Sequence, residues 1–295
     1  MFDYRYHALS LAAVLFALAL GVLIGVAIGD SDLVSSAKSG IVHDLESEIS
    51  AAHHQLSEQQ SRVASEEAFA NGLYPLAVHG LLSRRSVGLV FLGDSSQKID
   101  GLVHDAVTEA GGQVPSVVAV SEPLDLDGIE QDAVGTDFQS LAASPEMLER
   151  LGYVIGRQLV SGGRRVDSEL LSRVRSSLLS SFDGKLSHLD GVVVVRAEDP
   201  GMSAPQSEAS TAFDTGLLAG IAAGRATAVG AQMTSTVPSE ISWYKGRGLS
   251  SVDDLDTVAG QTALVYALAG QRGTYGSSAT ANSLLPAVTV PGQTP

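Results

Sequence analysis

The chain has 295 residues and a net charge of −15, from 18 lysines and arginines against 33 aspartates and glutamates. A nucleic-acid duplex is bound through a basic surface that displaces counterions, so this charge excludes nucleic acid as an expected partner. Because there is no cysteine, disulfides, thiolate metal sites and a cysteine nucleophile are also excluded. Only 17% of the residues are charged, against roughly 25% in an average soluble domain, which indicates a membrane segment.

Residues 8–28 predict a single transmembrane helix. They comprise 18 apolar residues, no charged residue, and Ser10, Gly21 and Gly25. At about 1.5 Å per residue, a helix of this length crosses a hydrocarbon layer of roughly 30 Å. The alternative is a cleaved signal peptide, which has a shorter apolar region of about 7–15 residues and more basic charge than Arg5 alone. By the positive-inside rule, Arg5 predicts a cytoplasmic tail at residues 1–7 and an extracytoplasmic location for the rest of this cell-membrane protein.

Three glycines recur every fourth residue at the end of this segment: Gly21, Gly25 and Gly29. They lie on one face of a helix and permit close approach of a second helix. Glycine is also simply common in membrane helices, so this spacing alone leaves both interpretations open.

Residues 31–70 predict a coiled coil. The apolar heptad seam comprises Val42, Leu45, Ile49, Ala52, Leu56 and Val63. Branched residues at position a with leucine at position d favour a parallel two-stranded coiled coil, and therefore a homodimer. The alternative is a helix packed on its own globular domain. Gln59 and Glu66 occupy later d positions, where they either loosen the coil or leave room for another helix.

Residues 86–282 predict an open, mainly parallel α/β domain, followed by a flexible tail at residues 283–295. Asn71-Gly72 and Pro75 are expected to end the long helix before this domain. Valine-rich segments that alternate with helical patterns are typical of a parallel sheet covered on both faces. The expected strands are 86–94, 114–120, 191–197 and 227–232, and the expected helices are 96–110, 145–160, 165–181, 205–223 and 257–268. Asp253, Asp254 and Asp256 are expected to open the last helix, since acidic residues suit a helix N-terminus.

In an open α/β sheet, ligands bind beyond the carboxyl ends of the strands. Those ends carry the segments 93–96, 121–123 and 198–200, which match no nucleotide-binding or hydrolase motif. Asp94 and Asp199 are a conceivable carboxylate pair, but strand-end aspartates more often cap the next helix. We therefore expect no catalytic residues and a protein that is not an enzyme.

The sequence contains few residues that are suitable copper ligands. Cuprous ion prefers thiolate and thioether ligands, and the four methionines are far apart along the chain. His53 and His54 are adjacent, so their side chains diverge by about 100° on a helix. We expect no resident cofactor, and only the family resemblance given next brings copper into consideration. Residues 8–28 also hold no ionisable group to line a pore, so a role in transport would be an accessory one.

The opening thirty residues, from Met1 to Asp30, resemble the mycobacterial copper transport protein B family of actinobacterial envelope proteins. The resemblance continues in FLGD (91–94), SSVDDLDTVAGQTALVYALAG (250–270), GTYG (273–276) and LLP (284–286). It implies a role in copper efflux or resistance, with an envelope channel proposed for one branch. Related corynebacterial proteins are membrane-anchored coiled-coil dimers that work with a cytosolic partner at the division septum and engage a peptidoglycan hydrolase. The resemblance brings no catalytic residues with it.

Two hypotheses follow for the function. In the first, the chain is a non-enzymatic, dimeric membrane scaffold with a role in copper homeostasis. Residues 1–7 would then meet a cytosolic partner, and the coiled coil would meet an extracytoplasmic one such as a peptidoglycan hydrolase. In the second, the chain is itself a component of a copper channel or transporter. A septal regulator that engages the hydrolase is the specific form of the scaffold role.

Overall fold

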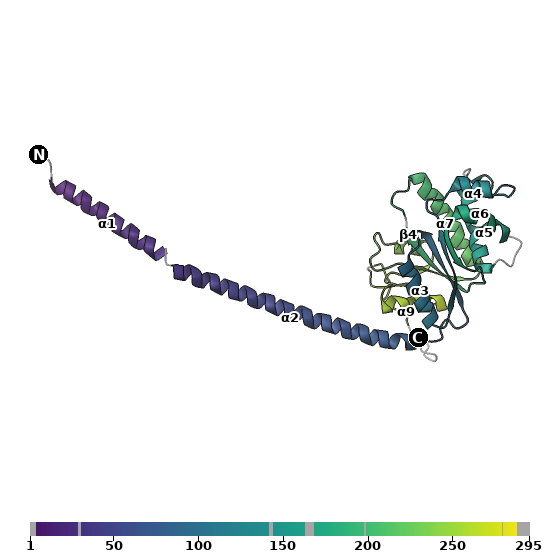
Figure 1. Ribbon diagram of the computed structural model, residues 1–295, viewed down its shortest axis with the longest axis horizontal. Coiled ribbons are helices and arrows are strands. Elements are labelled where there is room, and N and C mark those ends of the chain that lie inside the picture. The colour runs from purple at the N-terminus through teal and green to yellow at the C-terminus, as the bar shows by residue number, and fades with distance from the viewer. Residues whose placement is uncertain are drawn as a thin grey trace. The chain divides into compact units, whose positions relative to one another are not determined.

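The computed structural model describes residues 4–28, 31–141, 144–162, 168–197, 199–278 and 280–287. It divides into two units, residues 1–66 and residues 67–295. The first unit contains helix α1 (Tyr4–Ile28) and most of helix α2 (Ser31–Val78), and the second is an α/β domain (Figure 1). The α/β class and the apolar N-terminal helix are confirmed.

Helix α1 is long and apolar enough to cross a membrane over residues Tyr4–Ala27, by length and composition. None of that span is buried in the structure. Its large side chains are exposed, and those of Leu9, Phe16 and Leu23 are each more than two-thirds exposed. An apolar helix without protein around it is suited to a lipid environment, in which its backbone groups are already hydrogen-bonded internally.

Helix α2 runs through Asn71, Gly72 and Pro75, so the prediction that these residues end it was wrong. Pro75 lies in the last turn, where its missing N–H removes one hydrogen bond to the preceding turn. The end of the helix is held by the domain. Val78 is fully buried, and the hydroxyl of Tyr266 donates to the carbonyl of Ala77 (3.2 Å).

The domain is built on one seven-stranded sheet with the order β3-β2-β1-β4-β5-β6-β7. Every neighbouring pair is parallel except β2 and β3. The strands are β1 (Ser86–Gly93), β2 (Gln113–Val120), β3 (Leu179–Gly184), β4 (Gly191–Ala197), β5 (Thr227–Ala231), β6 (Ser250–Val252) and β7 (Thr274–Tyr275). The chain leaves β1 toward β2 and returns to the other side at β4, so the strand order reverses between β1 and β4.

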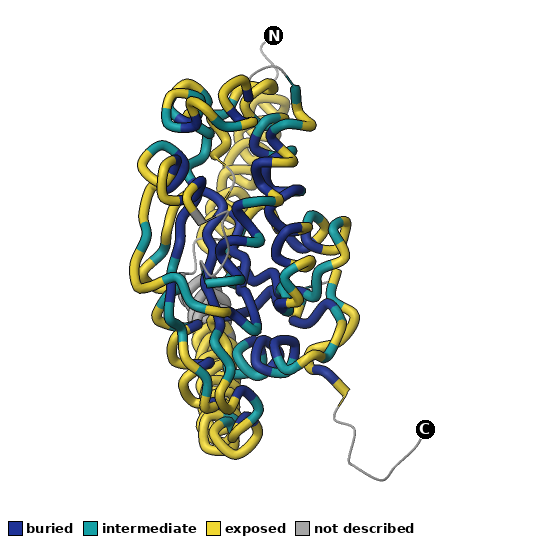
Figure 2. Tube along the Cα trace, turned by 90° about the vertical axis from the view of Figure 1, so that its right-hand side faces the viewer, coloured by how far each residue is buried: buried dark blue, intermediate teal, exposed yellow. Residues whose placement is uncertain are grey.

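Helices cover both faces of the sheet, and each face has its own apolar core (Figures 1 and 2). One face packs against α3 (Gln97–Glu109), α9 (Val258–Ala269) and the end of α2. The other packs against α4 (Leu126–Asp132), α5 (Pro145–Ser161), α6 (Ser168–Leu178), α7 (Ala204–Ala223) and α8 (Ile241–Gly246). The apolar run of β1 and the continuous valine run of β4 are buried because helices lie on both sides of them.

The four expected strands and the five expected helices of the domain are present, with one boundary error. The helix expected over 165–181 ends at Leu178, and residues 179–184 instead form β3, antiparallel to β2. That edge strand is mostly exposed and polar, so its local sequence does not indicate a strand; it forms by pairing with a distant segment. The short elements α4, α8, β6 and β7 were not predicted. Ser283, at the start of the predicted tail, bridges to Tyr275, and residues 288–295 lie outside the described part.

Four glycines let α5 and α7 pack with their backbones in contact. They are Gly152 and Gly156 on α5 and Gly216 and Gly220 on α7. A Cβ on Gly216 would lie 1.8 Å from the carbonyl oxygen of Glu149, and one on Gly220 would lie 2.1 Å from that of Tyr153. The four-residue spacing aligns each pair on one face of its helix, and any larger residue would force the helices apart.

Candidate functional site

The predicted coiled-coil seam lies on α2 and faces solvent in the single chain. Leu45, Ile49, Leu56 and Val63 are each between 48% and 54% exposed. Ala52 is exposed as well, and the side chain of Val42 lies outside the described residues. Large apolar side chains that repeat along one exposed helix face are typical of an association surface. The coiled coil and the homodimer stay predictions.

The glycine face of α1 is equally open. A Cβ at Gly21 or Gly25 would meet no atom within 4 Å, and Gly29 lies outside the described residues. Neither described glycine therefore has a packing role within its own chain. This is what a contact face for a second membrane helix requires, although the contact itself remains a prediction.

The carboxyl ends of β1 and β4 meet, as expected, where the strand order reverses. Gly93 pairs with Ala197 and adopts a positive φ of 101°, and a Cβ there would lie 2.4 Å from the carbonyl oxygen of Ala197. The expected helix caps are not the aspartates. Ser96 caps α3 by accepting from the amide of Ile99, and Asp199 accepts from the amide of Gly201 in a turn before α7.

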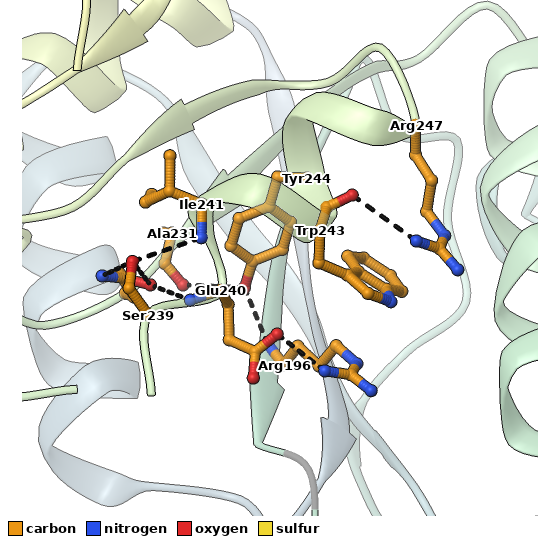
Figure 3. Close-up of polar contacts among 9 residues, drawn as sticks. Arg196, Ala231, Ser239, Glu240, Ile241, Trp243, Tyr244 and Arg247 are labelled. Atoms are coloured by element: carbon orange, nitrogen blue, oxygen red, sulfur yellow. Dashed lines mark hydrogen bonds and ion pairs between the residues drawn. The ribbon is translucent and has the colours of Figure 1, made fainter. Parts of the chain in front are cut away.

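A buried ion pair lies next to this edge, between Arg196 near the end of β4 and Glu240 in the loop before α8 (Figure 3). The distance from Arg196 Nη1 to Glu240 Oε2 is 2.7 Å, and both side chains are 8% exposed. The hydroxyl of Tyr244 accepts from the Arg196 amide (2.8 Å) and donates to the carbonyl of Ala231 (3.2 Å). One phenol thus joins the ends of β4 and β5 to helix α8.

Trp243 lies between two guanidinium groups in the same cluster (Figure 3). The guanidinium carbon of Arg196 is 5.0 Å from its ring centroid and that of Arg247 is 3.8 Å away. The carboxylate of Asp214, on α7, is 1% exposed and acts electrostatically on Arg247. Burial lowers the pKa of Arg247, with Asp214 and Glu240 opposing that shift. The cluster therefore holds two cations and two anions.

The charged cluster is suited to fixing α8 on the sheet. The Tyr244 ring occupies the space in which a Cβ on Gly230 would stand, 2.4 Å from ring atoms. Burial raises the pKa of Tyr244 above its usual value, so the phenol stays protonated and can donate. Our sequence analysis missed this cluster. Its one available signal was Arg196, a charge near the end of a strand in which the four residues before it are all valine.

The acidic segment before α9 does not serve as the expected helix opening. Thr257 is the cap, since its hydroxyl accepts from the amide of Gly260. Asp253 instead accepts from the amides of Ser277 and Ser278 and so ties down the loop after β7. Asp256 accepts from the amide and hydroxyl of Thr234.

Asp254, between them, is 2% exposed, and its Oδ1 has no hydrogen-bond partner among the described residues. Burial, reinforced by the neighbouring Asp253 carboxylate, raises the pKa of Asp254 to about 6.

Metal-ligating side chains do not gather in the described part of the chain. Within it there is no group of three or more histidine, aspartate or glutamate side chains placed to hold an ion. His53 and His54 are exposed on α2, and His104 and His188 each face a single aspartate.

The comparisons with known proteins connect this architecture to a family. The family model described as "Copper transport outer membrane protein, MctB" matches residues 1–286. Relatives named "Copper transporter MctB" from Mycobacterium tuberculosis (strain H37Rv) and Mycobacterium bovis are each 23% identical to this chain. Each alignment covers 94% of this chain and 96% of the relative. Because the family model spans both the apolar helix α1 and nearly all of the α/β domain, the chain belongs to the MctB family of copper transport proteins.

Proposed function

We propose that the chain is a non-enzymatic scaffold of the cell membrane that supports copper homeostasis as a parallel homodimer. Its N-terminus lies in the cytoplasm, α1 crosses the membrane once, and the remainder is extracytoplasmic. The observation that carries this proposal is the apolar seam of α2, half exposed, directly after a helix that can span a membrane. The copper role in this proposal rests on the family, whose mycobacterial members are named copper transporters.

Charged residues beside the seam support the parallel arrangement. With Ile49 at position a, Glu48 and Arg62 occupy g positions, and His53 and Glu67 occupy e positions. In a parallel dimer each g residue faces the e residue five positions later on the other helix. Glu48 then faces His53 of the second copy and Arg62 faces Glu67. All four side chains are exposed in the single chain and available for these contacts.

A direct copper conduit has less support than a scaffold. The described residues hold no metal-ligating cluster, and residues 8–28 contain no ionisable side chain to line a path through the bilayer. A single helix per subunit encloses no channel by itself. The scaffold instead affects copper through the partners that it brings together, a cytosolic one at residues 1–7 and an extracytoplasmic one at α2. A peptidoglycan hydrolase is the proposed form of the second partner.

The natural absence of cysteine makes the dimer directly testable. Leu45→Cys and Val63→Cys should each give a disulfide-linked dimer in membranes under mild oxidation, because identical seam positions meet in a parallel, in-register coil. Ser61→Cys, at the outer f position, is the matched control and should remain monomeric on a non-reducing gel. Equal cross-linking at all three positions, or at none, contradicts the proposed coil.

The role of the dimer in copper homeostasis needs a test in cells. A strain that lacks the gene should accumulate copper and become copper-sensitive, and the natural chain should reverse both effects. Ile49→Glu places a charge in the seam and should abolish dimerisation and rescue together, whereas Ser57→Glu on the outer face should rescue fully. Rescue by a monomeric Ile49→Glu chain would contradict the scaffold mechanism, and unchanged cellular copper in the deletion strain would contradict the copper role.

A further inference from the structure

A cleft of about 680 Å³ opens at the amino-terminal edge of the sheet, away from the ion pair of Arg196 and Glu240. It lies where α7, α8 and α9 end and β5 and β6 begin. Its volume falls within the range of roughly 300–1,000 Å³ that is usual for small-molecule sites. Polar groups from Thr215, Ser250 and Gln271 contribute to its wall.

Three arginines line this cleft, and no aspartate or glutamate is among the described residues that do so. They are Arg225, Arg247 and Arg272. The whole chain has almost twice as many acidic as basic residues, so a purely basic wall departs strongly from its composition. Arg225 and Arg272 are exposed, and the guanidinium of neither has a hydrogen bond or an ion pair within the described part of the chain.

Two of these arginines have unusual local environments, one in its backbone conformation and one in its contact with Trp243. Arg225 has a positive φ of 66°, a conformation in which glycine or asparagine is less strained, so the arginine side chain is kept at a conformational cost. Arg247 is stacked 3.8 Å from the centroid of Trp243, which fixes its guanidinium plane. The buried Nε of Arg247 has no hydrogen-bond partner among the described residues.

We infer that this cleft binds a small polyanion that carries two or more phosphate or carboxylate groups. A planar guanidinium donates two parallel hydrogen bonds to such a group, and three of them around one cleft match several groups at once. The carbonyl ends of α7, α8 and α9 carry partial negative charge and offset part of this potential. The competing explanation is that each arginine only compensates the helix end that precedes it.

The test uses the full chain in detergent, titrated calorimetrically with sodium pyrophosphate and, separately, with sodium citrate at constant ionic strength. Saturable binding of one molecule per chain is expected, and the stronger of the two titrations identifies phosphate or carboxylate as the preferred group. Arg225→Gln and Arg272→Gln should each weaken it about tenfold, the equivalent of one charge-assisted hydrogen bond. Arg173→Gln on α6 removes the same charge elsewhere and should leave binding unchanged.

Thermal unfolding without ligand separates the two explanations. Arginines that bind an anion should be replaceable by glutamine with little change in melting temperature but with loss of the titration. If the arginines only compensate helix ends, their replacement by glutamine should lower the melting temperature. In that case neither anion should give saturable binding to the natural chain. That result, or equal weakening by Arg173→Gln, would overturn the inference.

Discussion

Arg196 and Glu240 form an ion pair of 2.7 Å in which each side chain is 8% exposed. In such a pair the loss of one partner leaves the other charge buried, which costs more than the pair itself contributes. We therefore expect Glu240→Ala to destabilise the domain by about 3–5 kcal/mol in urea unfolding.

Removing both charges should cost less than removing one. In Arg196→Met/Glu240→Leu no unpaired charge remains, and the free energy of unfolding should lie above that of Glu240→Ala. A double variant that is as unstable as the sum of its single variants would mean that the two residues do not act as a pair.

The glycine contact between α5 and α7 predicts that one methyl group is costly at Gly216. The new Cβ of Gly216→Ala would lie 1.8 Å from the Glu149 carbonyl oxygen, so the helices must separate. We expect a loss of about 1–3 kcal/mol, typical of an overpacked core. Gly101→Ala on α3 is the matched control. Its Cβ would meet nothing within 4 Å, and it should stabilise the domain by roughly 0.5–1 kcal/mol, as alanine does in a helix. Equal effects of the two changes in thermal unfolding would contradict the close contact.

Charge reversal tests the register of the proposed dimer. Arg62→Glu should weaken dimerisation, since it faces Glu67 of the second copy, and Glu67→Arg should do the same. The double reversal should restore the natural affinity. Each exposed pair contributes about 0.3–0.5 kcal/mol and occurs twice per dimer, so the shift in the dissociation constant is several-fold at most. Sedimentation equilibrium in detergent at low salt measures it. If the double variant is the weakest of the three, the register is wrong.

The raised pKa of Asp254 predicts how the stability of the domain changes with pH. Its pKa is raised to about 6 in the folded protein, above the 3.8 of a free aspartate. Between these values the folded state binds more protons than the unfolded chain, so its contribution to stability is largest below pH 4 and is lost as the pH rises to 6. We expect Asp254→Asn to remove this decline, which amounts to about 1–3 kcal/mol. Urea unfolding at pH 4, 5, 6 and 7 checks this, and parallel profiles for the two proteins would contradict it.

The sequence was most informative where burial and periodicity coincide. The apolar run of β1 and the valine run of β4 predicted buried strands because they have almost no polar residue, and the length of the apolar span of α1 predicted a helix that can cross a membrane. Elements that exist through pairing with distant segments were missed. The edge strand β3 is polar, and β6 and β7 have three and two residues.

The same division holds for the candidate site. The heptad pattern of α2 is local, so the sequence alone could propose a seam, and the coiled coil itself stays a prediction. The contact between Arg196 and Glu240 joins residues 44 positions apart and has no periodic signature. The four-residue glycine spacing in α5 and α7 was visible in the sequence, but without the fold nothing indicated that the two segments face each other.

The buried charge cluster also has a consequence for finding ligands. Open α/β sheets ordinarily receive small molecules beyond the carboxyl ends of their strands. Beyond β4 and β5 this chain places its own guanidinium, carboxylate and phenol groups, which already satisfy one another. A compound directed there would have to replace contacts that hold α8 on the sheet, so its binding would be opposed by the loss of those contacts. A search for a natural ligand or an inhibitor is better directed at the opposite edge, where the proposed arginine cleft opens.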